Sequence, residues 1–215
     1  MALALFDLDN TILNGDSDHS WGLFLAEIGI VDPHEQAQLQ DKYYQDYLNG
    51  NLDIQAFLEF QLAPLGQHSS QQLYQWRSDY LTAKIKPMLE SGKPELLEPH
   101  REQGDHLMIV TATNDFITRP IADLLGVETL IATTAEFIDE RYTGKPTGTP
   151  SFKEGKVTRV KEWLNRNPQS LEGSYFYSDS INDLPLLEFV STPIAVTPDD
   201  SLRQHALNFG WKIID

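Results

Sequence analysis

The sequence predicts an α/β fold with a parallel sheet at its core and a separate group of helices inserted near the amino terminus. Short apolar runs typical of strands alternate with amphipathic helical segments from residue 106 onward. A further strand-like run begins the chain, and about 95 residues with helical periodicity separate it from the next one. With 215 residues, 40% of them hydrophobic, the chain can bury one sizeable core and a smaller module.

The first apolar run, residues 3–13, carries the most informative polar residues. Its sequence is LALFDLDNTIL, which delivers Asp7, Asp9 and then the hydroxyl of Thr11. The two aspartates would share a face on a strand, but the chain must begin to turn there, because Asn10 and Thr11 favour turns and caps. Two carboxylates at the carboxyl end of a buried strand are costly unless a cation or a reaction uses them. A strand followed by an Asx turn is the alternative, which a single aspartate would favour.

The long interval after this strand predicts four helices with short connections. Apolar periodicity places them at about residues 21–28, 33–47, 54–62 and 73–80, with caps at Asp32, Asp53 and Ser69. Four such helices form a small bundle. We expect residues 14–83 to form a separate helical module, and residues 1–13 and 84–215 to form the α/β core. A helical elaboration without a role is the alternative, but insertion directly after the acidic strand favours a lid.

Two later strands also end in polar residues. Strand 106–110 ends at Thr111, and a helical face that stops at Gly126 follows it. Strand 174–177 leads into Ser178, Asp179, Ser180, Ile181, Asn182 and Asp183. The other predicted core elements are a helix over 93–103, strands within 130–148 with a hairpin near 142–144, strand 193–196 and a helix after Asp199.

Two lysines, three residues apart, are candidates for a position near these strand ends. Lys156 begins a helix whose apolar positions Val157, Val160 and Leu164 recur at helical spacing, and Lys153 precedes it by three residues. We prefer Lys156 because Val160 follows it by four residues, as in the family described next. A lysine near a helix start is most often solvated surface.

Taken in order, these segments resemble the motifs of the haloacid dehalogenase-like (HAD) phosphohydrolases, and the resemblance covers essentially the whole chain. It implies a Rossmann-like core with a parallel sheet and an all-helical C1 cap. Within DxDxT, it implies that Asp7 is the nucleophile that forms an aspartyl-phosphate and that Asp9 is the general acid and base. Thr111 resembles the hydroxyl that holds a phosphate oxygen. Lys156 resembles the lysine that neutralises both Asp7 and the phosphate.

The same resemblance implies Mg²⁺ as cofactor. Asp179 would be a ligand alongside an oxygen of Asp7 and the backbone carbonyl of Asp9, while Asp183 would orient metal-bound water and Asn182 would lie near the phosphate. Hard oxygen ligands of this kind suit Mg²⁺. Two serines replace the glycines of the family's GDGxND motif, as in one HAD branch.

Within the family, the chain is most similar to the phosphoserine phosphatase-like IB branch, which includes histidinol-phosphate phosphatases. The resemblance implies substrate contacts from Asp16, at the amine-binding position, from Asn114, and from Gln61, where phosphoserine phosphatases have a carboxylate-binding arginine. An acidic residue without that arginine favours histidinol phosphate over phosphoserine, although Arg77 or Arg101 could supply a cation. Asp16, Asp18 and His19 could equally cap a helix.

Composition excludes several classes of function. The net charge of −16 disfavours nucleic acid, and no apolar run is long enough for a membrane span or signal segment, so we expect a cytoplasmic enzyme of a small phosphorylated metabolite. Cysteine is absent and the six histidines are scattered, which disfavours disulfides and zinc. The sequence does not indicate an oligomeric state. A phosphotransferase, and a HAD-fold protein that binds phosphorylated ligands without turnover, are the other possibilities.

Overall fold

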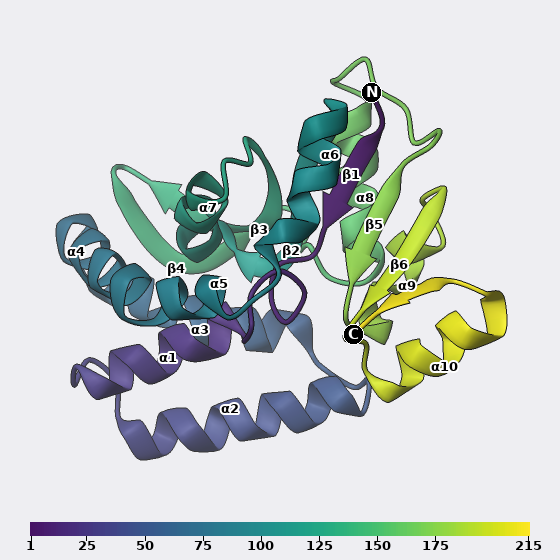
Figure 1. Ribbon diagram of the computed structural model, residues 1–215. Helices are drawn as coiled ribbons and strands as arrows, with labels where there is room; N and C mark the ends of the chain where they lie inside the picture. The colour runs from purple at the N-terminus through teal and green to yellow at the C-terminus, as the bar shows by residue number, and fades with distance from the viewer.

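A computed structural model describes all residues from 1 to 215, and its centre is a seven-stranded sheet (Figure 1). The strand order is β4-β3-β2-β1-β5-β6-β7, and every pair is parallel except β3 with β4. The strands are β1 (Leu3–Phe6), β2 (His106–Asn114), β3 (Thr129–Ile138), β4 (Arg141–Thr147), β5 (Tyr175–Ser178), β6 (Thr192–Val196) and β7 (Lys212–Ile214). The predicted α/β class with a parallel sheet is confirmed.

Helices cover both faces of the sheet, which explains why β1 is apolar at every position. Ala4 and Phe6 face one buried cluster, and Leu3 and Leu5 face the other. Strands buried on both sides need such continuous hydrophobic runs. The covering helices are α6 (Glu98–Gln103) and α7 (Asp115–Leu124) on the first face, and α8 (Glu154–Leu164), α9 (Leu184–Leu187) and α10 (Asp200–Phe209) on the second.

Four helices lie between β1 and the rest of the core, at the carboxyl end of β1 (Figure 1). The predicted caps at Asp32, Asp53 and Ser69 are confirmed, and Ser69 forms a capping box with Gln72. The helices are α1 (Ser17–Glu27), α2 (Pro33–Leu48), α3 (Ile54–Gln67) and α4 (Ser70–Tyr80). A π-helical turn (Leu81–Ile85), α5 (Lys86–Glu90) and a 3₁₀ turn (Pro94–Leu97) return the chain to α6, where one helix over 93–103 was expected.

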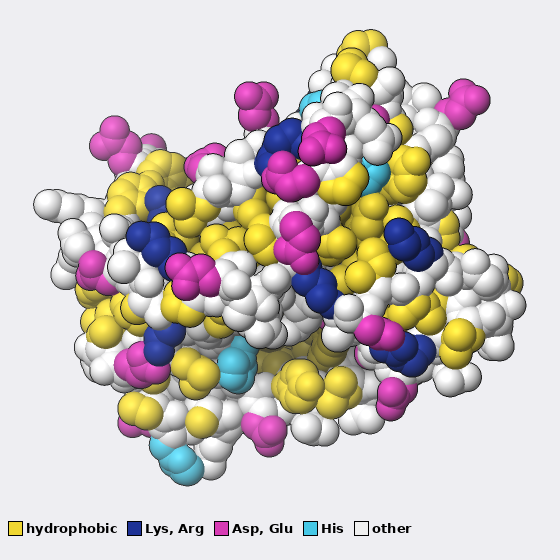
Figure 2. All heavy atoms as spheres, viewed as in Figure 1, with side chains coloured by type: hydrophobic (Ala, Val, Ile, Leu, Met, Phe, Trp, Pro, Cys, Tyr) yellow, Lys and Arg dark blue, Asp and Glu magenta, His cyan; other side chains and the backbone are white.

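The molecular surface carries acidic and basic side chains intermixed, and Figure 2 shows no continuous basic area on the face in view. None of the helices has both the length and the apolar character needed to cross a bilayer.

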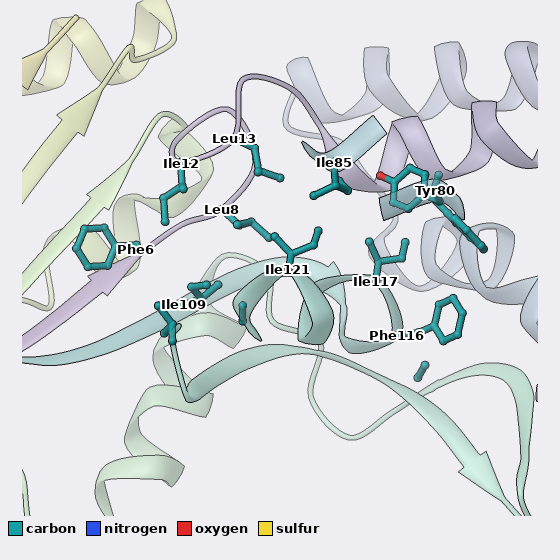
Figure 3. Close-up of a cluster of buried hydrophobic side chains, with 14 of the residues drawn as sticks. Phe6, Leu8, Ile12, Leu13, Tyr80, Ile85, Ile109, Phe116, Ile117 and Ile121 are labelled. Atoms are coloured by element: carbon teal, nitrogen blue, oxygen red, sulfur yellow. The ribbon is translucent and has the colours of Figure 1, made fainter. Parts of the chain in front are cut away.

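The inserted helices share one hydrophobic core with the sheet. Figure 3 shows Leu8 and Ile12, from the loop after β1, in one cluster with Ile85 and Ile121, and all four are fully buried. Tyr80, at the end of α4, is also buried and donates a hydrogen bond to the carbonyl of Ser17 at 2.7 Å. The acidic loop and the inserted helices are therefore held in one packed unit.

The β3–β4 hairpin turns at a different place from the one predicted. We expected the turn near 142–144, but those residues lie in β4, and the turn is at Asp139 and Glu140, with φ values of 48° and 62°. A tight hairpin needs positive φ at both central residues, which aspartate tolerates without glycine. Gly144 instead packs closely against Gly66 of α3: a Cβ on Gly144 would lie 3.3 Å from the Gly66 Cα, and a Cβ on Gly66 would lie 2.6 Å from the carbonyl oxygen of Thr143. The hairpin thus supports α3.

Candidate active site

A cavity of about 270 Å³ lies where the carboxyl ends of β1, β2 and β5 meet the inserted helices. The chain runs outward from β1 through β2 to β3 and then crosses to β5 on the other side, so the polar loops converge at this reversal. The polar side chains on the sheet side of the cavity are Asp7, Asp9, Asn10, Thr111, Thr113, Lys156, Asp179, Ser180, Asn182, Asp183 and Asp199. The structure therefore brings together polar residues far apart in the sequence.

Asp7 and Lys156 form the centre of this wall. Asp7 is the first residue after β1, and its backbone N–H donates to the carbonyl of Tyr177 at 2.9 Å. The Lys156 ammonium lies 2.7 Å from Oδ1 of Asp7 and 2.7 Å from the Asp183 carboxylate. Ser178 Oγ also donates to Asp183 at 2.7 Å, so the second carboxylate is fixed from two sides.

The start of α8 brings Lys156, and not Lys153, to Asp7. Lys156 is 2% exposed and reaches Asp7, whereas Lys153 donates to the carbonyl of Gly50 at 3.4 Å and does not line the cavity. Gly155 makes this possible, because a Cβ there would lie 2.0 Å from the carbonyl oxygen of Pro150. Any larger residue would displace the first turn that carries Lys156.

Asp179 and Asp7 approach each other through the hydroxyl of Thr11. Thr11 Oγ1 lies 3.0 Å from Oδ1 of Asp179 and 3.5 Å from Oδ2 of Asp7. Burial, and next the charge of Asp183, raise the pKa of Asp179 to about 7. Burial also raises the pKa of Asp7, and the positive charge of Lys156 partly opposes this increase. The negative charges of Asp183, Asp179 and Asp9 raise the Asp7 pKa further. The Lys156 ammonium pairs with the buried carboxylates of Asp7 and Asp183, and the partly exposed carboxylate of Asp179 has no cationic partner.

This donor set fits a divalent cation. Asp7 and Asp179 are hard oxygen ligands, and the excess of negative charge is what a cation would neutralise. No group of three or more His, Cys, Asp or Glu side chains is arranged to hold a metal ion by itself. Two carboxylates and a backbone carbonyl would leave coordination positions for water and a phosphate oxygen. The geometry is compatible with the Mg²⁺ ligands inferred from the motifs.

Asp9 lies beside Asp7, with its carboxylate turned toward the inserted helices. It accepts hydrogen bonds from the backbone N–H of Ser17 at 2.6 Å and from Thr113 Oγ1 at 2.8 Å. Burial, and next the charge of Asp16, raise its pKa to about 6. A carboxyl with that pKa can both hold and release a proton near neutral pH.

Comparison with known proteins assigns this arrangement to a family. Residues 4–188 match the haloacid dehalogenase-like hydrolases. The chain is 44% identical to a histidinol-phosphatase of Neisseria meningitidis serogroup C (strain 8013), over 99% of this chain and 98% of that protein. It is 31% identical to phosphoserine phosphatase SerB1 of Mycobacterium tuberculosis (strain ATCC 25618 / H37Rv), over 100% and 70% of the two proteins.

The chain belongs to the haloacid dehalogenase-like hydrolases. The family membership and hydrolase class predicted from the motifs are confirmed, and hydrolases of this family generally use Mg²⁺. A solved structure of a protein of unknown function from Bordetella pertussis Tohama I has a TM-score of 0.93 and 45% identity, and covers 100% of this chain and 98% of that chain. A substrate-bound phosphoserine phosphatase shares the fold, with a TM-score of 0.70 and 16% identity over 99% and 92% of the two chains.

The cavity wall on the side of the inserted helices differs in part from the expected substrate site. Asp16 lines the cavity, but its Oδ1 accepts from the N–H groups of Asp18 and His19 at 2.9 and 2.8 Å, so it caps α1. Asn114 does not line the cavity: it caps α7 and donates to Asp18 at 3.3 Å. Gln61 is buried and does line the cavity.

No arginine lines the cavity of this HAD hydrolase. Arg77 donates to the carbonyl of Phe116 at 2.7 Å, and Arg101 bonds to Glu98 and to the carbonyl of Leu125. Both arginines that could have replaced the missing cation are therefore engaged elsewhere. The basic side chains on the cavity wall are Lys156 and His19.

Several cavity residues were not predicted from the sequence. Asp199 joins the loop after β5 to α10, because its carboxylate accepts from Ile181 N at 2.7 Å and from Leu202 N at 2.8 Å. Six further cavity residues form a mainly aromatic wall: Gln40, Tyr43, Tyr44, Tyr47, Phe57 and Phe152. The first four recur on one face of α2 at helical spacing, and this was the available signal.

Proposed function

We propose that this HAD hydrolase is a Mg²⁺-dependent phosphomonoester hydrolase that acts on histidinol phosphate through an aspartyl-phosphate. The observation that supports this proposal most strongly is the buried Asp7 carboxylate, which lies 2.7 Å from the Lys156 ammonium in the wall of a cavity that Asp9 also lines. The 44% identical, full-length relative named histidinol-phosphatase supports the substrate.

The two aspartates divide the chemistry. Asp7 attacks phosphorus, so a bond forms between its carboxylate oxygen and phosphorus while the ester bond to the alcohol breaks. Asp9 gives its proton to the departing alkoxide, and afterwards it takes a proton from the water that hydrolyses the aspartyl-phosphate. The hydrogen bonds from Ser17 and Thr113 orient Asp9 for both transfers.

The remaining polar residues stabilise charge. Lys156 neutralises Asp7 and the phosphate, Thr111 holds a phosphate oxygen, Asn182 lies near the phosphate and Asp183 fixes Lys156. Asp7, Asp179 and the backbone carbonyl of Asp9 would hold Mg²⁺. When bound, Mg²⁺ screens the negative phosphate from the attacking carboxylate.

The cap side supports an amino-alcohol phosphate more than an amino-acid phosphate. It offers carboxylates and aromatic rings but no arginine, so an ammonium and an imidazole ring find partners whereas a carboxylate does not. Phosphoserine is the alternative substrate, supported by the relative named phosphoserine phosphatase SerB1.

We also propose that residues 14–83 are a C1-type cap that acts as a lid over the catalytic core, formed by residues 1–13 and 84–215. Helices α2 and α3 supply the cavity wall opposite Asp7. The proposed setting is cytoplasmic, with a small phosphorylated metabolite as partner.

Replacing Asp7 by asparagine tests the proposal. The amide keeps the shape of the side chain but cannot act as an anionic nucleophile, so Asp7→Asn should abolish Mg²⁺-dependent release of phosphate from histidinol phosphate and p-nitrophenyl phosphate. Asp41→Asn, an exposed change on α2 outside the cavity, is the matched control and should retain activity. Turnover by Asp7→Asn near that of the wild type, with deamidation excluded by mass spectrometry, would sink the mechanism.

A wild-type protein that binds phosphate esters without hydrolysing any member of a Mg²⁺-supplemented panel would support the binding-protein alternative. Transfer of phosphate to an added alcohol in preference to water would identify a phosphotransferase.

A further inference from the structure

Asp18 is a buried carboxylate on the cavity wall that the proposed chemistry does not use. It lies in the first turn of α1, is 6% exposed and lines the cavity. Its Oδ1 accepts one hydrogen bond, from Asn114 Nδ2 at 3.3 Å. Asp16 differs, because its Oδ1 is engaged by two backbone N–H groups at the cap of α1.

The charge of Asp18 has no partner within the chain. No lysine, arginine or histidine lies within ion-pair distance of Asp9, Asp16 or Asp18. Burial, and next the charges of Asp16 and Asp9, raise the pKa of Asp18 well above its usual value, with Gln61 opposing the increase. Of the basic residues on the wall, Lys156 is engaged by Asp7 and Asp183, and burial lowers the pKa of His19, which favours its neutral form.

Gln40 provides a second, independent sign of a missing donor. It is 4% exposed, lines the cavity and donates from Nε2 to the carbonyl of His19 at 3.0 Å, yet its Oε1 accepts no hydrogen bond. A buried amide oxygen without a donor is costly. An ammonium group has three donors and could serve both a carboxylate and an amide oxygen.

Adjacent residues on β2 hold Asp18 next to Asp9. Thr113 Oγ1 donates to Asp9, and Asn114 Nδ2 donates to Asp18. A group bound by Asp18 therefore lies close to the ester oxygen that Asp9 would protonate. In histidinol phosphate the amine is on the carbon next to the phosphorylated CH₂, which matches this proximity.

The other end of such a substrate would meet the aromatic wall. Tyr43 of α2 and Phe57 of α3 pack edge to face with ring centroids 5.5 Å apart, and both line the cavity. A flat imidazole ring suits such a surface.

We infer that Asp18, assisted by the amide oxygens of Gln40 and Gln61, binds the ammonium group of the substrate, and that Asp16 serves to cap α1. The inference rests on the proposed phosphatase function and deepens it. It predicts that the enzyme prefers phosphate esters with an amine on the carbon beside the phosphorylated one. It also predicts that this preference depends on the Asp18 carboxylate.

The test compares histidinol phosphate with its deamino counterpart, 3-(imidazol-4-yl)propyl phosphate, at pH 8, where both rings are neutral. The ratio of the two kcat/KM values is measured within each purified protein, so differences in folded fraction cancel. We expect the wild type to prefer histidinol phosphate by about 10- to 100-fold, because a charged hydrogen bond is lost with the amine. The ratio should fall to within about threefold in Asp18→Asn and stay at the wild-type value in Asp41→Asn.

A ratio in Asp18→Asn equal to that of the wild type, or a wild type without preference, would overturn the assignment while leaving phosphatase activity intact. If Asp18→Asn is inactive with every ester, Gln61→Arg provides the second variant. Its guanidinium would lie beside Asp18 and occupy the carboxylate, so the ratio should again fall, and an unchanged ratio would count against Asp18.

Failure of the proposed substrate is distinguishable from failure of this inference. A wild type that hydrolyses p-nitrophenyl phosphate but neither imidazole ester would refute histidinol phosphate as substrate. The Asp18 assignment would then be decided by phosphoethanolamine against ethyl phosphate: loss of the amine preference in Asp18→Asn supports it, and retention refutes it.

Discussion

At the scale of single residues, the surroundings of Asp9 suit the proton-transfer role proposed for it. Its carboxylate is oriented by Ser17 and Thr113, and its pKa of about 6 lies close to neutral pH. At Asp7, one position beyond β1, burial raises the pKa of the carboxyl, and the Lys156 ammonium 2.7 Å away opposes that increase. Two carboxylates two positions apart thus have different hydrogen-bond partners, which supports the different roles proposed for them.

Asp9→Asn should therefore affect substrates according to their leaving groups. The amide cannot donate a proton, so kcat with histidinol phosphate should fall by about 10²- to 10⁴-fold. The fall should be much smaller with p-nitrophenyl phosphate, whose phenolate needs little protonation. Steady-state kinetics on both esters measures this, and equal losses would indicate that Asp9 has a structural role only.

The carboxylates around Asp7 also predict how Mg²⁺ affects stability. In the metal-free protein the Asp179 pKa is about 7, above its usual value. The native state therefore binds more protons than the unfolded state between about pH 4 and pH 7, so the free energy of unfolding falls as pH rises through that window. Mg²⁺ should relieve the repulsion, and its effect on Tm should be larger at pH 8 than at pH 5.5.

Calorimetry with and without Mg²⁺ at the two pH values checks this expectation. Asp179→Asn is the matched variant, because it removes the titrating charge and should reduce the increment at pH 8. Equal Tm increments at both pH values in the wild type would contradict the predicted coupling.

At the scale of elements, α2 contacts the core at its far end as well as through the cavity. The hydroxyl of Tyr47 lies 2.5 Å from Ser180 Oγ, in the loop that follows β5, and its ring packs near Phe152. Ser180 stands where the family's motif has a glycine, so the serine supplies a contact that glycine cannot. The Oγ of Ser180 also accepts a hydrogen bond from the backbone N–H of Asn182 at 3.3 Å. Ser180 therefore links α2 to the loop that carries Asp179.

Tyr47→Phe should lower kcat/KM for histidinol phosphate by about fivefold, which corresponds to one hydrogen bond. The loss should shrink in a Ser180→Ala background, because the partner is already gone. The double-mutant cycle measures the coupling directly. Fully additive losses would show that the two side chains act independently.

At the scale of the whole molecule, the charge of −16 opposes the approach of a phosphate ester. The cavity wall adds to this, since it has seven aspartates, namely Asp7, Asp9, Asp16, Asp18, Asp179, Asp183 and Asp199. Capture must depend on short-range contacts, because salt screens charges beyond about 8 Å at physiological ionic strength.

Raising the ionic strength from about 0.02 to about 0.15 M should therefore increase kcat/KM, by roughly twofold for p-nitrophenyl phosphate and by less for histidinol phosphate, whose ammonium offsets part of the charge. Stopped assays at saturating Mg²⁺, with sodium and potassium chloride compared, measure this. A decrease with salt for both esters would indicate attractive steering instead.

The sequence by itself determined most of the elements and placed Asp7 and Asp9 directly after the first strand. The caps at Asp32, Asp53 and Ser69 were predictable because a cap depends on residues within one turn. Asp7 and Asp9 were likewise recognisable, since their spacing from a single buried strand carries the motif. The hairpin turn was misplaced because Asp139 and Glu140 adopt positive φ without a glycine to mark them.

Only the tertiary structure decided which distant side chains meet. It brought Lys156 and not Lys153 to Asp7, left Asn114 off the cavity wall, and turned Asp18 toward the cavity while Asp16 capped the helix. These outcomes depend on how α1, α2 and α8 pack against the sheet. Packing is decided by contacts between residues far apart in the chain, so local spacing can reveal that residues share a helix face but not what that face will line.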